Sequence, residues 1–301
     1  MRLFRSHFSL LLAGSLALMA AVACAPGARV VSPPTFRLDA AASGFVSIDP
    51  PGVGDGTALF RVALIAENPN PIGVKLASLD GSLFFREVRA AAVSFRGGID
   101  LPGYGSAQLL LDVRVPLGAA PALLDALAAL VGGSPVRYRV EAAVGIELLG
   151  TVQRFPSFTL AQGELSSPLV LVAPRLSLVA STLRFEAVNR VSLRLELDVF
   201  NAGVVGYLLR SPQISLLVGG AEAASVALAP TAVPATGAGS AILTFSFDPL
   251  RLGPALVAQI QAASAGAAGL SISLSGAWSL EAPGLASLNL NPATVLQEIV
   301  R

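Results

Sequence analysis

The sequence predicts a mainly β protein with two tandem antiparallel β-sandwich domains, each holding one short helix. Three observations predict it: apolar and polar residues alternate over many short segments, the pattern recurs along the chain, and each half has one segment with helical spacing. Apolar residues make up 53% of the 301 residues and charged residues 13%, so the chain has enough core material for two folded domains.

Alternation is clearest in two segments. In residues 193–199 every odd position is apolar and every even position is charged, and residues 136–142 have nearly the same form. Successive side chains of a strand point to opposite faces, so such segments have one buried and one wet face. Half-buried strands separated by turn residues are typical of antiparallel sandwiches.

An offset of 133–134 residues aligns the two halves of the chain, beginning with Asn68 on Asn201. Four further pairs of segments align in the same order: 105–107 with 239–241, 109–113 with 243–247, 121–124 with 254–257, and 136–142 with 270–276. Solenoid repeats have periods of about 20–50 residues, so this long offset predicts duplicated domains. We expect the domains to cover residues 36–165 and 166–301.

Each half contains one short helical pattern. Pro121 suits the first helical position, and the apolar periodicity after it ends at Gly132. In the second half, Asp248 stands before a proline as a helix N-cap, and apolar residues up to Ile260 share one face. A last short helix, expected to begin at Asn291, would carry Val295, Leu296 and Ile299.

The first 23 residues have the pattern of a targeting signal. Arg2 and Arg5 form a positive start, and residues 8–23 are an apolar run that ends in small residues. The run is shorter than the roughly 20 apolar residues that a membrane-spanning helix needs. We therefore expect residues 1–23 to be removed as a lipoprotein signal peptide.

Two interpretations of the cleavage site are open. Residues 21–24, Ala-Val-Ala-Cys, resemble a bacterial lipobox, in which the cysteine receives the lipid, although Ala21 stands where leucine is usual. The same alanines also fit an ordinary cleavage site. Cys24 is the only cysteine, and a lone free thiol is unusual in an exported protein, which favours lipid attachment at Cys24. Residues 24–35 would then be a tether, and the protein would be extracytoplasmic and bound to a membrane of the cell envelope through its lipid.

A specific motif follows the first strong strand pattern. Asn68, Pro69 and Asn70 form an Asn-Pro-Asn turn, and a second Pro-Gly turn lies at residues 101–106 before another alternating strand. In this combination, residues 57–147 resemble the late embryogenesis abundant type 2 family, also described as the water stress and hypersensitive response (WHy) domain. Residues 190–280 keep Asn201 but lack the proline and the second asparagine, so the second copy is more divergent.

The resemblance implies a fibronectin type III or immunoglobulin-like β-sandwich with a helix. It also implies a role in tolerance of desiccation or other stress, and it brings no catalytic residues. The three motif asparagines and Pro69 are expected to shape turns.

Composition excludes several kinds of chemistry. The only histidine, His7, lies in the signal, so catalysis or zinc binding by Cys and His is not expected, and no metal or cofactor is predicted. The formal net charge of +1 gives no electrostatic footprint for nucleic acid. Arg137 and Arg139 are expected on a solvated face, and Trp278 is expected in the core.

The sequence therefore predicts a non-enzymatic, envelope-anchored protein with a stress- or desiccation-protective role. The alternative is a lipid-binding or scaffolding lipoprotein that docks onto an envelope complex. The expected partners are a membrane, through the N-terminal lipid, and client proteins or envelope lipids. The oligomeric state is left open.

Overall fold

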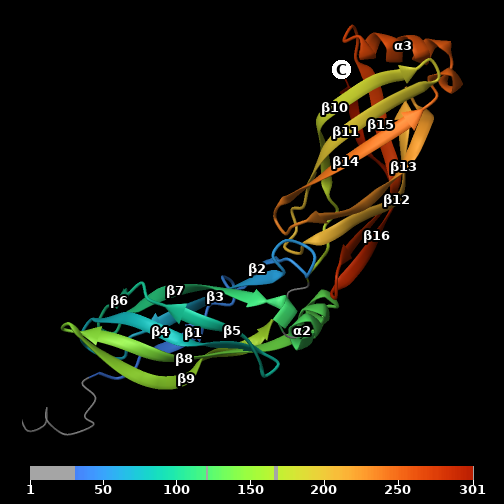
Figure 1. The fold of residues 1–301 in the computed structure, drawn as a ribbon. Coiled ribbons are helices and arrows are strands. Elements are labelled where there is room, and N and C mark those ends of the chain that lie inside the picture. The colour runs from blue at the N-terminus through green and yellow to red at the C-terminus, as the bar shows by residue number, and fades with distance from the viewer. Residues whose placement is uncertain (1–30, 120, 166–168, 301) are drawn as a thin grey trace, which may run out of the picture.

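The computed structural model describes residues 31–119, 121–165 and 169–300. Its strands form antiparallel sheets joined by short turns, with two α-helices, so the predicted mainly β, sandwich-like fold is confirmed. Figure 1 shows two β-rich bodies that meet end to end at an angle. We call the described residues up to 165 the first half and those from 169 the second half.

The first half has two facing sheets. One contains β1 (Thr35–Leu38), β2 (Gly44–Ile48), β3 (Thr57–Glu67) and β7 (Ser106–Pro116). The other contains β4 (Val74–Phe85), β5 (Val88–Phe95), β6 (Ile99–Leu101), β8 (Val136–Leu148) and β9 (Thr151–Leu165). A 3₁₀ turn (Leu117–Ala119) and the helix α2 (Pro121–Val131) link β7 to β8, as the helical spacing predicted.

The second half has the corresponding arrangement. One sheet contains β10 (Arg175–Ala187), β11 (Arg190–Phe200) and β14 (Ala238–Phe247). The other contains β12 (Tyr207–Val218), β13 (Ala221–Val233), β15 (Leu270–Ala282) and β16 (Ala286–Val300). The helix α3 (Pro254–Ser264) lies between β14 and β15, as α2 lies between β7 and β8.

The core lies between the facing sheets. Phe60 on β3 is fully buried, and its ring lies 5.5 Å from that of Phe85 on the opposite sheet, in an edge-on arrangement. In the second half, Leu195 on β11 is fully buried and Trp278 on β15 is 3% exposed, so the tryptophan is a core residue as predicted. The alternation of apolar and polar residues thus marks the buried face correctly.

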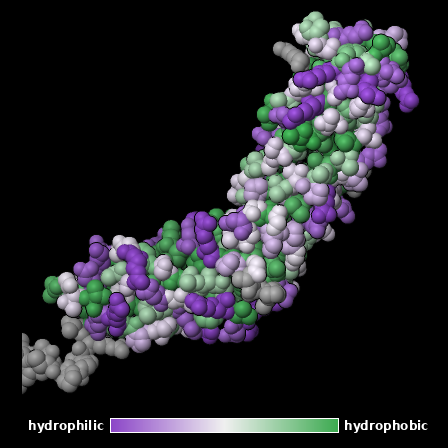
Figure 2. Space-filling view, viewed as in Figure 1, coloured by the Kyte–Doolittle hydropathy of each residue, from purple (hydrophilic) through white to green (hydrophobic). Residues whose placement is uncertain are grey.

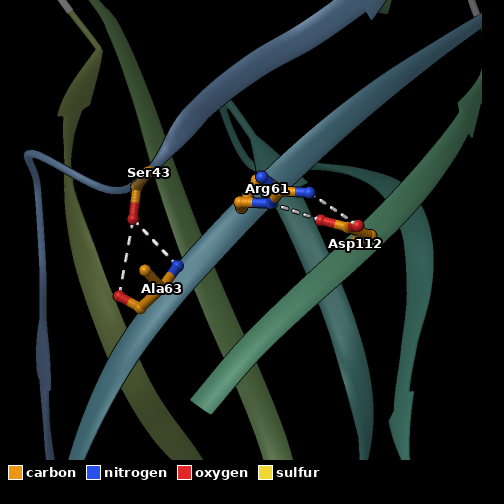
Figure 3. A network of polar contacts seen from close by, with 4 residues as sticks. All are labelled: Ser43, Arg61, Ala63 and Asp112. Atoms are coloured by element: carbon orange, nitrogen blue, oxygen red, sulfur yellow. Dashed lines mark hydrogen bonds and ion pairs between the residues drawn. The ribbon is translucent and has the colours of Figure 1, made fainter. Parts of the chain in front are cut away.

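The outer face of the β3–β7 pair carries a bidentate ion pair (Figure 3). Arg61 Nε lies 2.7 Å from Asp112 Oδ1, and a second guanidinium nitrogen lies 2.9 Å from Oδ2. The two side chains are 40% and 47% exposed, so solvent screens the pair. Exposed pairs of this kind stabilise a fold by about 0–1 kcal/mol.

The edge opposite β3 is broken into β1 and β2, whereas β10 runs unbroken along β11. At the break, the Ser43 hydroxyl accepts a hydrogen bond from Ala63 N–H at 2.9 Å and donates one to the Asp39 carbonyl at 2.8 Å (Figure 3). The serine therefore replaces part of the missing strand ladder.

Two sequence predictions about helices are corrected. Residues 291–299 are not helical but belong to β16, where Leu296 pairs with Leu274 and Ile299 with Ser271. Leu296 is buried and Ile299 is 63% exposed, which suits a strand because positions three apart lie on opposite faces. Asp248 caps a separate 3₁₀ turn (Pro249–Leu252) rather than α3, since Gly253 adopts a φ of 90° between the two.

The register of the strands also changes one part of the predicted repeat. Glu67 pairs with Ser106, and Phe200 pairs with Ala238, so Ser106 corresponds to Ala238 rather than to Ser240. The predicted alignment of residues 105–107 with 239–241 was therefore two residues off. A shift of two keeps every side chain on the same face, so alternation alone cannot detect it.

Three predictions fall outside the described residues: the signal over 1–23, the lipid on Cys24, and the domain boundary at 165–166, which adjoins residues 166–168. The division into domains 36–165 and 166–301 stays a prediction. Within the described ranges, no helix has the length and hydropathy that crossing a membrane requires.

Candidate functional site

The Asn-Pro-Asn motif forms a tight corner at the end of β3. Asn68 is 3% exposed, and its side-chain Nδ2 donates to the carbonyls of Ile72 at 2.8 Å, Leu101 at 3.1 Å and Pro102 at 3.0 Å. Its Oδ1 accepts from the backbone N–H of Asn70 at 2.9 Å. The Asn68 amide therefore ties together the two turns that the sequence singled out, while Pro69 is exposed between the asparagines.

The second asparagine holds the incoming chain. Asn70 Oδ1 accepts from the backbone N–H of Ser32 at 2.8 Å, and Asn70 Nδ2 donates to the Ser32 carbonyl at 3.0 Å. Asn70 Nδ2 also donates to Asn68 Oδ1 at 2.8 Å. One side chain thus pairs with both backbone groups of Ser32, three residues before β1. Ser32 lies on the side of β1 that leads towards Cys24.

The second half builds the same corner with fewer parts. Asn201 is fully buried, and its Nδ2 donates to the carbonyls of Val205 at 2.9 Å and Pro234 at 3.2 Å. Its Oδ1 accepts from Gly203 N–H at 2.8 Å. These bonds match those of Asn68, so the asparagine retained in the second half has a structural role in both corners.

The loss of the second asparagine has a visible consequence. Gly203 stands where the first half has Asn70, and a Cβ at Gly203 would lie 2.9 Å from Val172 Cγ2. Val172 precedes β10 as Ser32 precedes β1. Close packing on a glycine therefore holds the incoming chain of the second half, where hydrogen bonds from an asparagine hold that of the first.

The two halves meet at the corner of the second half. The N–H of Ile48, the last residue of β2, donates to the Val204 carbonyl at 2.7 Å, and Gly206 N–H donates to the Ile48 carbonyl at 2.8 Å. Asp49 Oδ1 accepts from Ala235 N–H at 2.7 Å. The end of β2 therefore adds a short parallel bridge to the second half.

Asp49 was not singled out in the sequence. No local pattern could reveal it, because its partner Ala235 is 186 residues away. Burial raises the pKa of Asp49, the hydrogen bond from Ala235 lowers it, and the charge of Asp55 raises it, with a net increase. A Cβ at Gly206 would lie 2.4 Å from Asp49 Oδ1, so only glycine fits beside the carboxylate.

A cavity of about 440 Å³ lies between the β4–β5 turn and the start of β8. Arg137 Nε lies 3.2 Å from Glu164, and an Arg139 guanidinium nitrogen lies 2.9 Å from Glu87. The Arg139 guanidinium also stacks 5.0 Å from the ring centroid of Phe84. Both arginines therefore have acidic partners, which weakens any attraction for an anion. The Arg137 side chain is 83% exposed, as predicted, whereas that of Arg139 is 31% exposed and only partly solvated.

Across residues 31–119, 121–165 and 169–300, no group of three or more His, Cys, Asp or Glu side chains is arranged to hold a metal ion. The candidate site is thus the pair of asparagine corners, and its hydrogen bonds run to protein groups rather than towards an open cleft. The arrangement fixes backbone turns and the entry of the chain.

Comparison with solved structures finds only distant likenesses. A protein from Archaeoglobus fulgidus is 15% identical, with a TM-score of 0.27, over 39% of this chain and 91% of that one. Red sea bream transglutaminase is 10% identical, with a TM-score of 0.28, over 91% of this chain and 32% of that one. A β-glycosidase from Bacteroides vulgatus is 11% identical, with a TM-score of 0.15, over 88% and 25%. Likenesses this weak carry no functional argument.

Comparison with curated proteins finds no match. Comparison with family models finds one: residues 64–157 match the model described as late embryogenesis abundant protein. The matched segment begins within β3, contains the corner of Asn68, Pro69 and Asn70, and ends within β9. The match supports the late embryogenesis abundant type 2 family for this part of the first half.

Proposed function

We propose that this protein is a non-enzymatic protector against desiccation or related stress, held at the cell envelope by a lipid on Cys24. The observation that carries the proposal is the family match over residues 64–157, which contains the Asn-Pro-Asn corner. The late embryogenesis abundant type 2 family is not an enzyme family. The signal-like N-terminus and the lipobox-like residues 21–24 support the anchor.

The corners suit a fold that must survive loss of water. The Asn68 side chain is bonded to protein carbonyls and amides, and Asn201 is fully buried with protein partners. Polar groups satisfied inside the protein do not lose their partners when bulk water is withdrawn. We therefore expect the turns at both corners to stay formed as the surface dries.

Surface ion pairs act in the same direction. The cross-strand pairs Arg61–Asp112 and Arg37–Glu67 contribute little in water because both partners are solvated. Attraction between charges grows as the effective dielectric constant falls. Partial drying therefore strengthens these pairs while the hydrophobic contribution weakens.

The alternative of a lipid carrier has less support. A carrier needs an apolar cavity that encloses the lipid chain. Between the sheets of the first half, the Phe60 ring fills the space, with centroids of neighbouring rings 4.9 Å away at Phe45 and 6.1 Å away at Tyr138. Scaffolding on an envelope complex is the alternative that the experiment below separates from protection.

The test is protection of a labile enzyme by the purified mature chain, residues 24–301 with Cys24→Ser. Equal masses of this chain or of an unrelated β-sandwich protein are dried with the enzyme and rehydrated. We expect less light scattering and more recovered activity with this chain. Equal aggregation in both samples would contradict protection. One stoichiometric partner captured by crosslinking in the native envelope would then favour the scaffold.

A further inference from the structure

Three large apolar side chains lie exposed at the free end of the first half. Ile72 is 46% exposed, Tyr104 is 74% exposed and Leu149 is 97% exposed. They come from the Asn-Pro-Asn corner, the β6–β7 turn and the β8–β9 turn, respectively. We call these three residues the apolar tip. Figure 2 shows hydrophobic surface at this end of the molecule, where Figure 1 places the β8–β9 turn.

Contacts join the three turns into one end. Tyr104 N–H donates to the Asn70 carbonyl at 2.9 Å, so the β6–β7 turn lies on the corner. Leu149 lines a cavity of about 420 Å³ together with Gly73 and Pro102, the neighbours of the other two turns. The apolar tip is therefore one surface rather than three unrelated side chains.

Turn chemistry does not explain these residues. Tyr104 has a φ of 53° and Leu149 a φ of 51°, both in the left-handed region that favours Gly, Asn and Asp. The β15–β16 turn of the second half has Gly284, with a φ of 76°. The first half thus places bulky apolar side chains at turn positions where small or polar residues would cost less.

The equivalent end of the second half is covered. Val205, the counterpart of Ile72, is fully buried and bridges to Ile48 of the first half. A second copy of the chain could not cover the apolar tip in this way, because β10 runs unbroken into a short turn at Val188 and has no counterpart of the loop after Ile48. The occupant must be something else.

The chain enters at the same end, which indicates the occupant. Asn70 holds Ser32 there, and Cys24 is eight positions earlier. At about 3.5 Å per extended residue, a lipid on Cys24 lies at most about 28 Å from Ser32. The charged residues beside the apolar tip, Lys75, Asp100 and Glu147, give no basic excess for anionic headgroups.

We propose that the apolar tip inserts into the interfacial region of a zwitterionic lipid bilayer, so that the protein stands on the membrane with its first half down. Tyrosine suits this region because its ring is apolar and its hydroxyl is polar, and an exposed leucine beside it reaches the acyl boundary. The inference rests on the proposed lipid anchor for the nearness of the bilayer.

The experiment supplies the anchor chemically. Residues 24–301 are coupled through Cys24, the only thiol, to a maleimide-headgroup lipid in phosphatidylcholine vesicles. Leu149→Trp is the reporter, and Val188→Trp, at an 81% exposed position on the β10–β11 turn, is the matched control. Trp278 is buried, and its emission is measured in the parent chain and subtracted.

We expect brominated phosphatidylcholine to quench roughly half of the emission at position 149, because bromines near the acyl boundary reach an inserted indole. The control should be unquenched, and added salt should change neither. Reporter emission as insensitive to bromine as the control, in a chain whose circular dichroism matches the parent, would overturn the inference. Because coupling replaces the native lipid, that result would leave the native anchor to be judged by the mass of the natural protein.

Discussion

The Asp49 carboxylate accepts a hydrogen bond at 2.7 Å from the backbone N–H of Ala235, across 186 residues of sequence. Together with the bridge between Ile48 and Val205, it joins the end of β2 to the asparagine corner of the second half. The break in the strand opposite β3 frees β2 to make this contact. The unbroken β10 makes no equivalent contact, so the two halves are similar in fold but differ at this edge.

Replacing Asp49 by alanine should weaken the junction. Asp49→Ala leaves the Ala235 N–H without its acceptor, which costs about 1–3 kcal/mol when the donor is kept from water. We expect a lower urea midpoint in the mature chain and separation of one unfolding transition into two. Asp49→Asn keeps an acceptor oxygen and is the matched control. An unchanged midpoint for Asp49→Ala would contradict the role of this bond.

The stability of the junction should depend on pH with an unusual sign. The folded pKa of Asp49 is raised, mainly by burial, so the folded state binds a proton more tightly than the unfolded state. The stability contributed by the protonated form is present below the unfolded value of 3.8 and is lost as pH rises through the higher folded pKa. Unfolding by urea across this range should show the loss in the parent and not in Asp49→Asn.

Asp112 should give the opposite slope. The side-chain hydrogen bond from Arg61 lowers the pKa of Asp112, so its contribution is present above 3.8 and is lost as pH falls through the lower folded value. Asp112→Asn should therefore remove stability at neutral pH and leave acid stability unchanged. The same urea series measures both variants, and parallel pH profiles for Asp49→Asn and Asp112→Asn would contradict the assignment.

The two asparagines of the first corner should have separable roles. Asn68→Ala leaves buried carbonyls without donors and should cost about 1–3 kcal/mol in urea unfolding. Asn70→Gly copies the second half, so the unfolding midpoint should change little. The segment before β1 should then be cut faster in limited proteolysis, because Ser32 loses both of its bonds. Equal proteolysis of parent and Asn70→Gly would show that Asn70 does not hold the incoming chain.

The mass of the natural protein tests the anchor. Protein extracted from its native membrane should have the mass of residues 24–301 plus a diacylglyceryl group, with or without an N-acyl chain. Cys24→Ser should lack this addition and leave the membrane fraction. An unmodified chain released to the medium in both cases would rule out the lipid on Cys24.

The sequence predicted what depends on local periodicity. The buried face of β11 and the helix α2 follow from alternation and helical spacing, and the Asn-Pro-Asn corner follows from turn chemistry. Residues 286–300 were misjudged in part because Asn-Pro also begins helices, and the pairing with β15 that makes them a strand is not local. The contact between Asp49 and Ala235 and the two-residue register difference of β14 depend on tertiary pairing, which alternation does not encode.

The most direct test of the proposed function is survival of the cells that make this protein after drying and rehydration. Strains carrying the natural gene, a deletion and Cys24→Ser are compared at matched protein level. The account predicts that the deletion strain loses viability and that the unanchored variant restores it only in part. Equal survival of the deletion and the natural strain would contradict a protective role.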